Sequence, residues 1–188
     1  MTQGCVLQAR GITCYRDENV LFSDVTFTLD AGQALQIEGV NGAGKTTLLR
    51  ILCGLGLADE GDVFWQDQPV RQCRDEFNAS LVYIGHQEGL KGDLTPIENL
   101  RMDRALHCTN SQMTESEAIA RLGLLDRDEV LCRHLSAGQR RRVALARLLL
   151  LQARLWVLDE PLTALDVKGR KTIEGLIAEH VNQGGMAV

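Results

Sequence analysis

The sequence predicts an α/β fold in which a mainly parallel β-sheet core carries an inserted helical subdomain. A short β-type run, QALQIEG at 33–39, leads directly into a glycine-rich turn and a helical pattern. A continuous apolar run at 155–158 is typical of a parallel strand that is covered on both faces. Between them, residues from about 90 to 150 show helical periods. We therefore expect a sheet core that is interrupted by a helical lobe.

Length and composition fit one soluble domain. The chain has 188 residues, of which 45% are apolar and 24% charged, and this is enough to bury a core. The net charge of -5 argues against a protein whose main function is to hold nucleic acid electrostatically. No stretch approaches the roughly 20 apolar residues that a membrane span needs, and the N-terminus lacks the apolar region of a signal peptide. We therefore expect a cytosolic protein.

The cysteines and histidines suggest neither disulfides nor a metal cluster. The six cysteines lie at wide, irregular spacings without a C-x-x-C pair, and the four histidines are scattered. We expect reduced thiols, mostly buried. The cysteines are Cys5, Cys14, Cys53, Cys73, Cys108 and Cys132.

The chain up to residue 85 is expected to alternate β-strands with turns, before and after one helix. The turn signals are glycines and acidic residues between short β-type runs. The expected strands are 6–15, 24–32, 33–39, 61–66 and 80–85, and the expected helix is 45–55.

The rest of the chain is expected to hold three helices, a buried strand and a final helix. The expected helices are 96–106, 116–125, 137–152 and 167–181, with the strand at 155–158. We accordingly place 1–86 and 152–188 in the core, with an antiparallel β part near the N-terminus, and 87–151 in the helical subdomain.

The stretch GVNGAGKTT fits the pattern G-x-x-x-x-G-K-[ST], whose glycines let consecutive backbone N–H groups turn inward around phosphate oxygens. The helix that starts near Lys45 adds its positive end, and the Lys45 ammonium reaches the terminal phosphates. Thr46 is placed to give a hydroxyl oxygen to Mg²⁺. The expected phosphate-binding loop consists of Gly39, Val40, Asn41, Gly42, Ala43, Gly44, Lys45, Thr46 and Thr47.

Two acidic residues, Asp159 and Glu160, end the apolar run LWVLDE. The carboxyl ends of strands are where α/β sheets present ligand-binding groups. Asp159 is placed to hold Mg²⁺ through its water shell, and Glu160 to polarise a water that attacks the γ-phosphate. Such a pair means little alone, but with the glycine loop it completes a phosphate and metal site.

The stretch LSAGQ lies just before an expected helix, and two interpretations of it remain open. Ser136 either only caps the helix, with Gly138 in the turn, or the exposed N–H groups of this helix end bind the nucleotide of another subunit. The run Arg140–Arg142 that follows is expected to be a solvated helix face.

Together, GVNGAGKTT, LSAGQ and LWVLDEP resemble the motifs of the nucleotide-binding domains of ABC ATPases, and the match covers essentially the whole chain. LSAGQ is a conservative variant of the LSGGQ signature of that family. The resemblance implies a P-loop NTPase with a RecA-like core, ATP and Mg²⁺ as ligands, and ATP hydrolysis as the activity. It assigns the signature, which acts in trans, to Leu135, Ser136, Ala137, Gly138 and Gln139.

The same resemblance implies roles for single residues. Tyr15, 30 residues before Lys45, matches the aromatic residue that stacks on adenine. Gln87 in YIGHQ matches the loop that senses Mg²⁺ and the attacking water, and Asp166 in TALD matches the loop that crosses the dimer interface. Two domains are expected to pack head to tail, with each ATP between the Lys45 loop of one and the Ser136 loop of the other. The implied metal-binding residues are Thr46, Gln87 and Asp159, and the implied catalytic residues are Glu160 and Gln87.

Within ABC ATPases, the stretches YIGHQEGLK, HLSAGQRRRVALARL and DEPLTALDV are most similar to the ATPase subunits of the bacterial cytochrome c maturation system. This implies a homodimer at the cytoplasmic face of the inner membrane, bound through its helical subdomain to the integral membrane subunit CcmB, with CcmC and CcmD. Hydrolysis is then tied to haem export or to release of the haem-loaded chaperone CcmE. The residues suggest no direct contact with haem, and no nucleic-acid partner is expected.

The alternative is a soluble, non-transport ABC ATPase that acts as a clamp in DNA repair or translation. That class usually carries tandem nucleotide domains, long coiled-coil insertions or basic arms, none of which the sequence shows. Co-purification with a multi-span membrane protein would favour the transport class. Salt-sensitive binding to nucleic acid or ribosomes would favour the clamp.

The sequence ends on HVNQGGMAV, where a helix gives way through a glycine pair to the first residues of a strand. In ABC domains this strand leads into a loop whose histidine contacts the γ-phosphate. His180 precedes the strand and is no substitute. We favour a truncated product of a longer protein, the alternative being a shortened variant with weakened hydrolysis, and the final strand and histidine loop are then missing.

Overall fold

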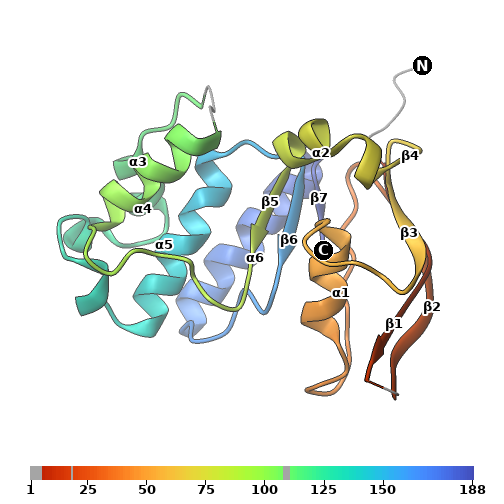
Figure 1. Cartoon of the computed structure of the whole chain (residues 1–188). Coiled ribbons are helices and arrows are strands. Elements are labelled where there is room, and N and C mark those ends of the chain that lie inside the picture. The colour runs from red at the N-terminus through yellow and green to blue at the C-terminus, as the bar shows by residue number, and fades with distance from the viewer. Residues whose placement is uncertain (1–5, 18, 108–110) are drawn as a thin grey trace. The chain divides into compact units, whose positions relative to one another are not determined.

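In the computed structural model, which describes residues 6–17, 19–107 and 111–188, the chain forms two compact units (Figure 1). The first unit runs to Tyr83 and also contains Arg154–Asp159 and Glu179–Val188. The second unit contains Ile84–Ala153 and Glu160–Ala178. This division differs from the sequence-based one mainly in residues 160–178, which lie with the helical unit.

The first unit contains a four-stranded antiparallel sheet with the strand order β2-β1-β3-β4. The long antiparallel pair of β1 and β2 places Tyr15 opposite Val20 and Leu7 opposite Leu29. The predicted strands at 6–15 and 24–32 are therefore present, and the second begins five residues earlier than expected. The strands are β1 (Val6–Arg16), β2 (Asn19–Asp30), β3 (Glu60–Trp65) and β4 (Gln68–Pro69).

A second sheet has the order β5-β6-β7, and β6 and β7 run parallel. All four residues of β6 are buried, which agrees with the apolar run that predicted it. The carboxyl end of β6 leads directly to Asp159. The strands are β5 (Leu81–Ile84), β6 (Leu155–Leu158) and β7 (Met186–Ala187).

The run 33–39 was predicted to be a strand, and this prediction is wrong. It forms only one isolated parallel bridge, between Ala34 and Ala187, supported by a 2.8 Å hydrogen bond from the Leu35 N–H to the Ala187 carbonyl. Among the described residues, 35–39 form no further bridge. The segment still passes beside the parallel sheet and delivers the chain to the glycine loop.

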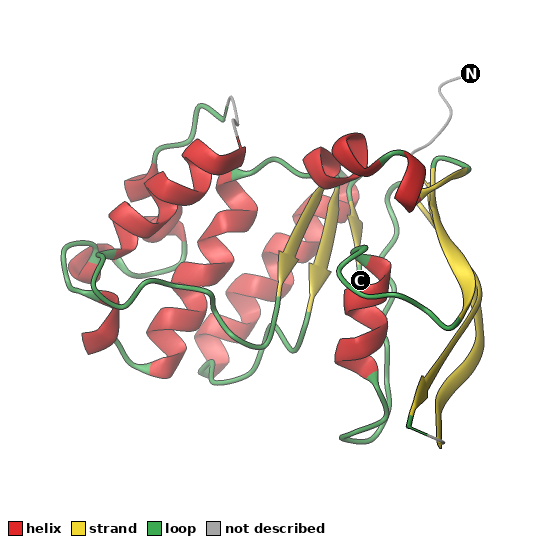
Figure 2. Ribbon diagram, in the orientation of Figure 1, coloured by secondary structure: helices red, strands yellow, loops and turns green. Residues whose placement is uncertain are grey.

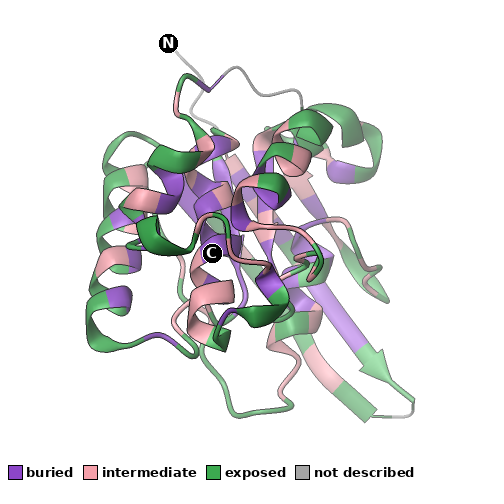
Figure 3. Ribbon diagram, turned by 90° about the vertical axis from the view of Figure 1, so that its left-hand side faces the viewer, coloured by how far each residue is buried: buried purple, intermediate pink, exposed green. Residues whose placement is uncertain are grey.

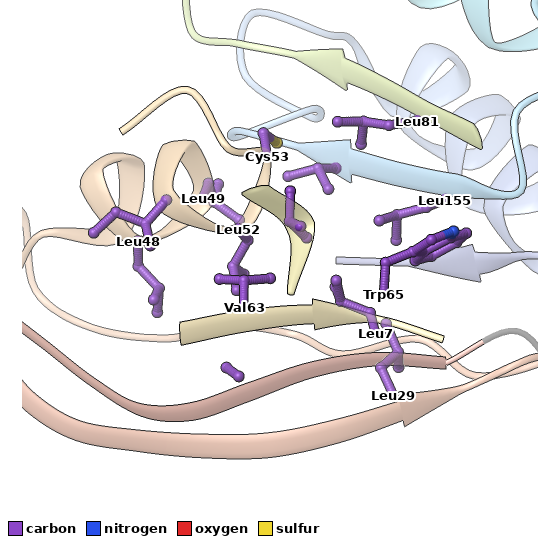
Figure 4. Packing of buried hydrophobic residues seen from close by; sticks show 14 of the residues in the cluster. Leu7, Leu29, Leu48, Leu49, Leu52, Cys53, Val63, Trp65, Leu81 and Leu155 are labelled. Carbon is purple, nitrogen blue, oxygen red and sulfur yellow. The ribbon is translucent and has the colours of Figure 1, made fainter. Parts of the chain in front are cut away.

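One face of α1 (Lys45–Leu52) packs into the core of the first unit (Figure 4). Leu48, Leu49 and Leu52 of this helix are buried and pack with side chains of both sheets. Trp65 adds an edge-to-face contact with Phe77, with ring centroids 5.4 Å apart. The other members labelled in Figure 4 are Leu7, Leu29, Cys53, Val63, Leu81 and Leu155. This packing fixes the helix that begins at Lys45.

The second unit is built from helices (Figure 2). Within it, α3, α4 and α5 pack against one another. Figure 3 shows helices with both exposed and buried positions, as expected where one face of a helix covers a core. The helices are α3 (Pro96–His107), α4 (Glu115–Arg121), α5 (Ala137–Leu150) and most of α6 (Val167–Asn182), whose residues from Glu179 on belong to the first unit, as does α2 (Arg74–Ser80). Short 3₁₀ segments occupy Val70–Gln72, Leu125–Arg127 and Cys132–His134.

The described cysteines are free thiols. Burial raises the pKa of the Cys53 thiol to about 12, which keeps this group protonated at neutral pH. In the described parts of the chain, no helix is both long enough and apolar enough to span a bilayer. The free cysteines are Cys14, Cys53, Cys73 and Cys132, while Cys5 and Cys108 lie outside the described residues.

Candidate functional site

The glycine loop needs glycine at two positions where the backbone is left-handed. Gly42 has φ 85° and Gly44 has φ 87°, which side-chain-bearing residues rarely adopt. A Cβ atom at Gly44 would also lie 2.6 Å from a side-chain carbon of Leu21 and 2.9 Å from one of Phe22. The loop therefore passes directly over β2, and any other residue at Gly44 would displace it.

The N-terminus of α1 is left open for an anion. Gly44 is the N-cap and offers no side chain to the first N–H groups, and the first turn of the helix has no acidic residue. The helices α4 and α5, by contrast, each have a complete capping box. Uncapped N–H groups at the positive end of a helix are suited to bind phosphate oxygens.

Lys45 bends over the loop that precedes it. Its Nζ donates hydrogen bonds to the carbonyl oxygens of Gly39, at 2.6 Å, and Val40, at 3.1 Å. The ammonium group is thus already held at the loop by main-chain oxygens. A phosphate entering the loop would meet this charge without a large movement of the side chain.

Thr46 and Asp159 meet in the first unit, as the sequence analysis required for a phosphate and metal site. The Thr46 hydroxyl donates a 2.8 Å hydrogen bond to Oδ2 of Asp159, whose side chain is 3% exposed. A hydroxyl and a carboxylate oxygen are hard ligands of the kind that Mg²⁺ prefers. Among the described residues no group of three or more acidic, His or Cys side chains forms a metal site by itself. This pair therefore fits a cation that takes most of its ligands from water and nucleotide phosphates.

Tyr15 lies at the end of the β1-β2 hairpin that packs on the glycine loop. It is 44% exposed, and its backbone N–H donates a 2.7 Å hydrogen bond to Oδ2 of Asp59. It pairs in register with Val20, the neighbour of the Leu21 that contacts Gly44. The first unit thus brings together an exposed aromatic ring, the glycine loop and the carboxylate of Asp159.

Glu160 and Gln87 belong to the second unit. Glu160 has φ 49°, an uncommon left-handed conformation for a residue with a side chain. Its carboxylate accepts a 3.2 Å hydrogen bond from the Thr163 hydroxyl, and one of its oxygens lies 4.0 Å from Nδ1 of His86. Gln87 is exposed in a bend three residues after the end of β5. The carboxylate and the amide are thus both accessible to solvent.

The signature residues form the start of α5. The Ser136 hydroxyl accepts a 3.2 Å hydrogen bond from the Gln139 N–H, and the Gln139 side chain accepts one from the Ser136 N–H. Ser136 is therefore an N-cap, as one of the two interpretations stated. Its exposure leaves the second interpretation, a role in trans, available as a proposal. Leu135 beside it is buried, and Ala137 is exposed.

Asp166, predicted to lie at a dimer interface, caps α6. Its Oδ1 accepts a 2.8 Å hydrogen bond from the Gly169 N–H, and its carbonyl accepts one from the Arg170 N–H. The carbonyl oxygen of Ala164, two residues before Asp166, lies close to Gly138. A Cβ atom added at Gly138 would be 2.5 Å from this oxygen. The signature and the TALD loop therefore touch within one subunit.

Sequence reasoning missed Arg141. The run Arg140–Arg142 was expected to be a solvated face, but Arg141 is 4% exposed and hydrogen-bonds to backbone carbonyls of Gly85 and Glu160. The available signal was helical spacing, because Arg141 lies three, four and seven residues before buried positions of α5.

Comparisons with known proteins decide the family. The family model described as ABC transporter matches residues 22–163. The chain is 50% identical over 183 residues to the "Cytochrome c biogenesis ATP-binding export protein CcmA" of Aliivibrio fischeri, covering 97% of this chain and 90% of that protein. The chain belongs to the CcmA family of ABC transporter ATP-binding proteins.

Further similarities agree with membership of the CcmA family. The CcmA protein of Escherichia coli K12 is 49% identical over 183 residues, covering 97% of this chain and 87% of that protein. A solved structure described as the ATP-binding subunit of an ABC transporter superposes with a TM-score of 0.84 at 24% identity, covering 97% of this chain and 78% of that one. The predicted family, the P-loop NTPase fold class and the assignment as an ABC transporter ATPase are confirmed. Membership of the CcmA family implies ATP as a ligand.

Proposed function

We propose that the chain binds ATP with Mg²⁺ and hydrolyses it as the ATPase subunit of an ABC transporter complex in cytochrome c biogenesis. The observation that carries this proposal is the hydrogen bond between Thr46 and Asp159. It joins the glycine loop to the end of β6, which supports a phosphate site and a metal site that lie side by side. The proposal has further support from the CcmA relatives, which are named ATP-binding export proteins.

Residues of the first unit bind the nucleotide in this proposal. The N–H groups of the loop and of the α1 N-terminus surround the phosphates, and Lys45 neutralises their charge. Tyr15 stacks on adenine with its exposed ring. Thr46 and Asp159, with Gln87, would hold Mg²⁺, which would offset negative charge on the phosphates.

Hydrolysis requires a base, and we assign this role to Glu160. Its carboxylate accepts the proton of a water molecule as the water oxygen bonds to the γ-phosphorus. The bond from that phosphorus to the bridging oxygen breaks, and ADP leaves with the electron pair. Gln87 orients the attacking water through its side-chain amide. Thr163 holds the carboxylate through its hydroxyl, which lies 3.2 Å away.

The active form in this proposal is a head-to-tail homodimer. The residues Leu135 to Gln139 of one subunit complete the nucleotide site of the other, using N–H groups at the start of α5. Ser136 supports this role because it is exposed while it caps the helix. Asp166 follows the loop that contacts Gly138 and lies at the subunit interface.

The relatives' name supports a proposal for the cellular role. We infer that ATP hydrolysis by this chain powers haem export, or release of a haem-loaded chaperone, during cytochrome c biogenesis. Its partners are then the integral membrane subunit CcmB, with CcmC and CcmD, and it lies at the cytoplasmic face of the inner membrane. The net charge of -5 gives no support to the alternative of a nucleic-acid clamp.

Nucleotide binding is tested with a fluorescent ATP analogue in the presence and absence of Mg²⁺. Lys45→Ala should weaken binding at least about 100-fold, because the charge that meets the terminal phosphates is lost. Thr46→Ala should weaken binding only when Mg²⁺ is present. Lys171→Ala, at an exposed position of α6, and Thr172→Ala, at a half-buried one, are matched controls and should bind like the parent chain. Unchanged binding by Lys45→Ala would contradict the assignment.

The cellular role is tested by affinity purification of the tagged chain from detergent-solubilised membranes. We expect a multi-span membrane protein among the co-purified partners. Association with ribosomes or nucleic acid that is lost at raised salt would instead favour the clamp.

A further inference from the structure

The side chain of Arg141 connects two loops of the candidate site. Nη1 donates a 2.6 Å hydrogen bond to the carbonyl of Gly85, and Nη2 donates a 2.9 Å hydrogen bond to the carbonyl of Glu160. Gly85 follows β5 and lies two residues before Gln87. One guanidinium group therefore holds the main chain at two places. The first is Glu160, the candidate base, and the second is Gly85, close to Gln87, the candidate for orienting the water.

The environment of Arg141 makes these bonds strong. Hydrogen bonds from a guanidinium are charge-assisted, and the planar fork of donors fixes the separation and direction of two acceptors. At 4% exposure, water does not compete for the donors as it does on the surface. The neighbours Arg140 and Arg142 are only half-buried, and their side chains bond to carbonyls of Leu135, Gly138 and Leu122.

The Glu160 backbone needs such support. Its φ of 49° is a left-handed conformation that costs an ordinary residue roughly 1 kcal/mol or more. The direction of the side chain depends on that backbone conformation, so a change at the carbonyl would move the carboxylate. The bond from Arg141 to the Glu160 carbonyl and the bond from Thr163 to its carboxylate hold both ends of the residue.

We propose that Arg141 is a positioning residue for ATP hydrolysis. From α5 it holds the backbone of Glu160 and, through the carbonyl of Gly85, the segment that leads to Gln87. This inference rests on the proposed function. Arg141 lies five residues after Ser136 on the same helix. The signature, which meets the nucleotide of the other subunit, and Arg141, which holds the backbone of Glu160, thus belong to one rigid helix.

The test compares Arg141→Met with the parent chain. Methionine has a similar length and tolerates burial, but it donates no hydrogen bond. We expect kcat for ATP hydrolysis to fall about 10- to 100-fold, as for a small misplacement of a catalytic group, while KM for ATP changes less than about 3-fold. Arg141→Lys, which keeps the charge without the fork, should give an intermediate loss.

The matched control is Arg104→Met. Arg104 lies on α3 in the same unit, is partly buried, and bonds to the carbonyls of Ser111 and Met113 and to the carboxylate of Glu115. It contacts neither Gly85 nor Glu160 through any of these bonds. The kcat of Arg104→Met should stay within about 2-fold of the parent value if the loss of turnover comes from the Arg141 hydrogen bonds alone.

A double-mutant comparison separates a positioning role of Arg141 from general destabilisation of the chain. In a Glu160→Gln background the base is already lost, so Arg141→Met should change the residual turnover less than about 2-fold. Hydrogen exchange of Arg141→Met should rise in peptides containing 85–89 and 160–164, with α3 and α4 unchanged.

The outcomes distinguish the two proposals. Normal turnover by Glu160→Gln would remove Glu160 as the base and overturn the proposed function of this residue. If Glu160→Gln is impaired but Arg141→Met and Arg141→Lys keep the parent kcat, the inference about Arg141 fails. It also fails if Arg141→Met lowers turnover by the same factor in both backgrounds, or if exchange rises throughout the unit.

Discussion

Glu160 combines three features that suit a general base. Its carboxylate is exposed, it follows the buried Asp159, and its backbone is held in an uncommon conformation by contacts on both sides. Strained backbone in a folded protein persists only where the surroundings hold it in place. The position is therefore fixed by the fold, while the side chain remains accessible to substrate.

We predict that Glu160→Gln leaves ATP binding intact and slows turnover by two or more orders of magnitude. The amide has nearly the same shape as the carboxylate but does not accept the proton of the attacking water. Steady-state phosphate release and binding of a fluorescent ATP analogue measure the two effects separately. Thr163→Val should lose less activity, since it removes only one hydrogen bond to the carboxylate. An equal loss of binding and turnover would argue for a structural role.

His180 gives a pH-dependent contribution to stability. Its ring stacks on Trp156, with centroids 3.8 Å apart, and Nε2 lies 3.2 Å from the Met186 carbonyl. Burial lowers the pKa of this imidazole below its ordinary value of 6.5, although carbonyls of Met186 and Arg154 act in the opposite direction. Below about pH 6.5 the unfolded chain takes up a proton that the folded chain resists. The folded state is therefore increasingly penalised as pH falls.

The corresponding prediction compares the parent chain with His180→Phe, which keeps a flat ring against Trp156 without a titratable group. The parent should lose stability relative to the variant when pH is lowered from 7.5 to 5.5. Urea unfolding followed by far-UV circular dichroism at several pH values measures this difference. A stability difference that stays constant with pH would show that His180 does not titrate differently on folding.

Sequence reasoning at the residue scale succeeded where a residue type has one strong chemical use. The glycine loop was predictable because left-handed positions and uncapped N–H groups require glycine at fixed spacing. Arg141 was missed because a run of three arginines is usually solvated, and burial of its guanidinium depends on carbonyls of Gly85 and Glu160. Those carbonyls are brought to it by tertiary structure, which local charge patterns do not record.

At the scale of elements, the start of α5 is packed against the TALD loop. Gly138 lies in the first turn of the helix, and the Ala164 carbonyl occupies the space that a side chain at Gly138 would need. Ala164 itself has φ 63°, so the loop is already in a restricted conformation. A change at either residue should therefore displace the other element.

We predict that Gly138→Ala destabilises the chain by about 1–3 kcal/mol, as is typical of overpacking, and lowers ATP turnover without weakening ATP binding. The matched control is Gly175→Ala in the interior of α6, where a Cβ atom meets no atom within 4 Å. That change should instead stabilise the chain by about 0.5–1 kcal/mol, because alanine favours the helix. Chemical denaturation of both variants gives the two free energies. Similar effects of the two changes would contradict the packing argument.

The ends of elements were less predictable than their existence. The helix expected at 45–55 ends at Leu52, and the helix expected at 116–125 ends at Arg121. In both, a glycine with positive φ follows within two residues, namely Gly54 and Gly123. The strand expected at 33–39 failed for another reason, because an alternating pattern does not show whether a neighbouring strand is present to pair with it.

At the scale of the whole molecule, the candidate residues are divided between two units. The first holds Tyr15, the glycine loop and Asp159, which bind nucleotide and metal in our proposal. The second holds Gln87, the signature and Glu160, which act on the γ-phosphate in our proposal. Asp159 and Glu160 are adjacent in sequence but belong to different units. In our proposal, hydrolysis therefore uses residues of both units and, in the dimer, of both subunits.

The dimer is tested with two substitutions of Ser136. Ser136→Ala removes the hydroxyl that accepts from Gln139 and should cost about 1 kcal/mol of stability. Ser136→Arg places a long, charged side chain at the proposed interface and should also block closure of the dimer. Both variants should bind ATP like the parent, since in our proposal the signature acts on the nucleotide of the other subunit.

The decisive measurement is ATP-dependent dimerisation in the Glu160→Gln background, where slow hydrolysis should allow the closed dimer to accumulate. Analytical ultracentrifugation with ATP and Mg²⁺ should show a dimer for Glu160→Gln and a monomer when Ser136→Arg is added. Ser136→Ala, which loses the cap but adds no bulk, should still dimerise. If both Ser136 variants dimerise and turn over ATP equally, Ser136 only caps α5. In that case the signature of one subunit does not complete the nucleotide-binding site of the other.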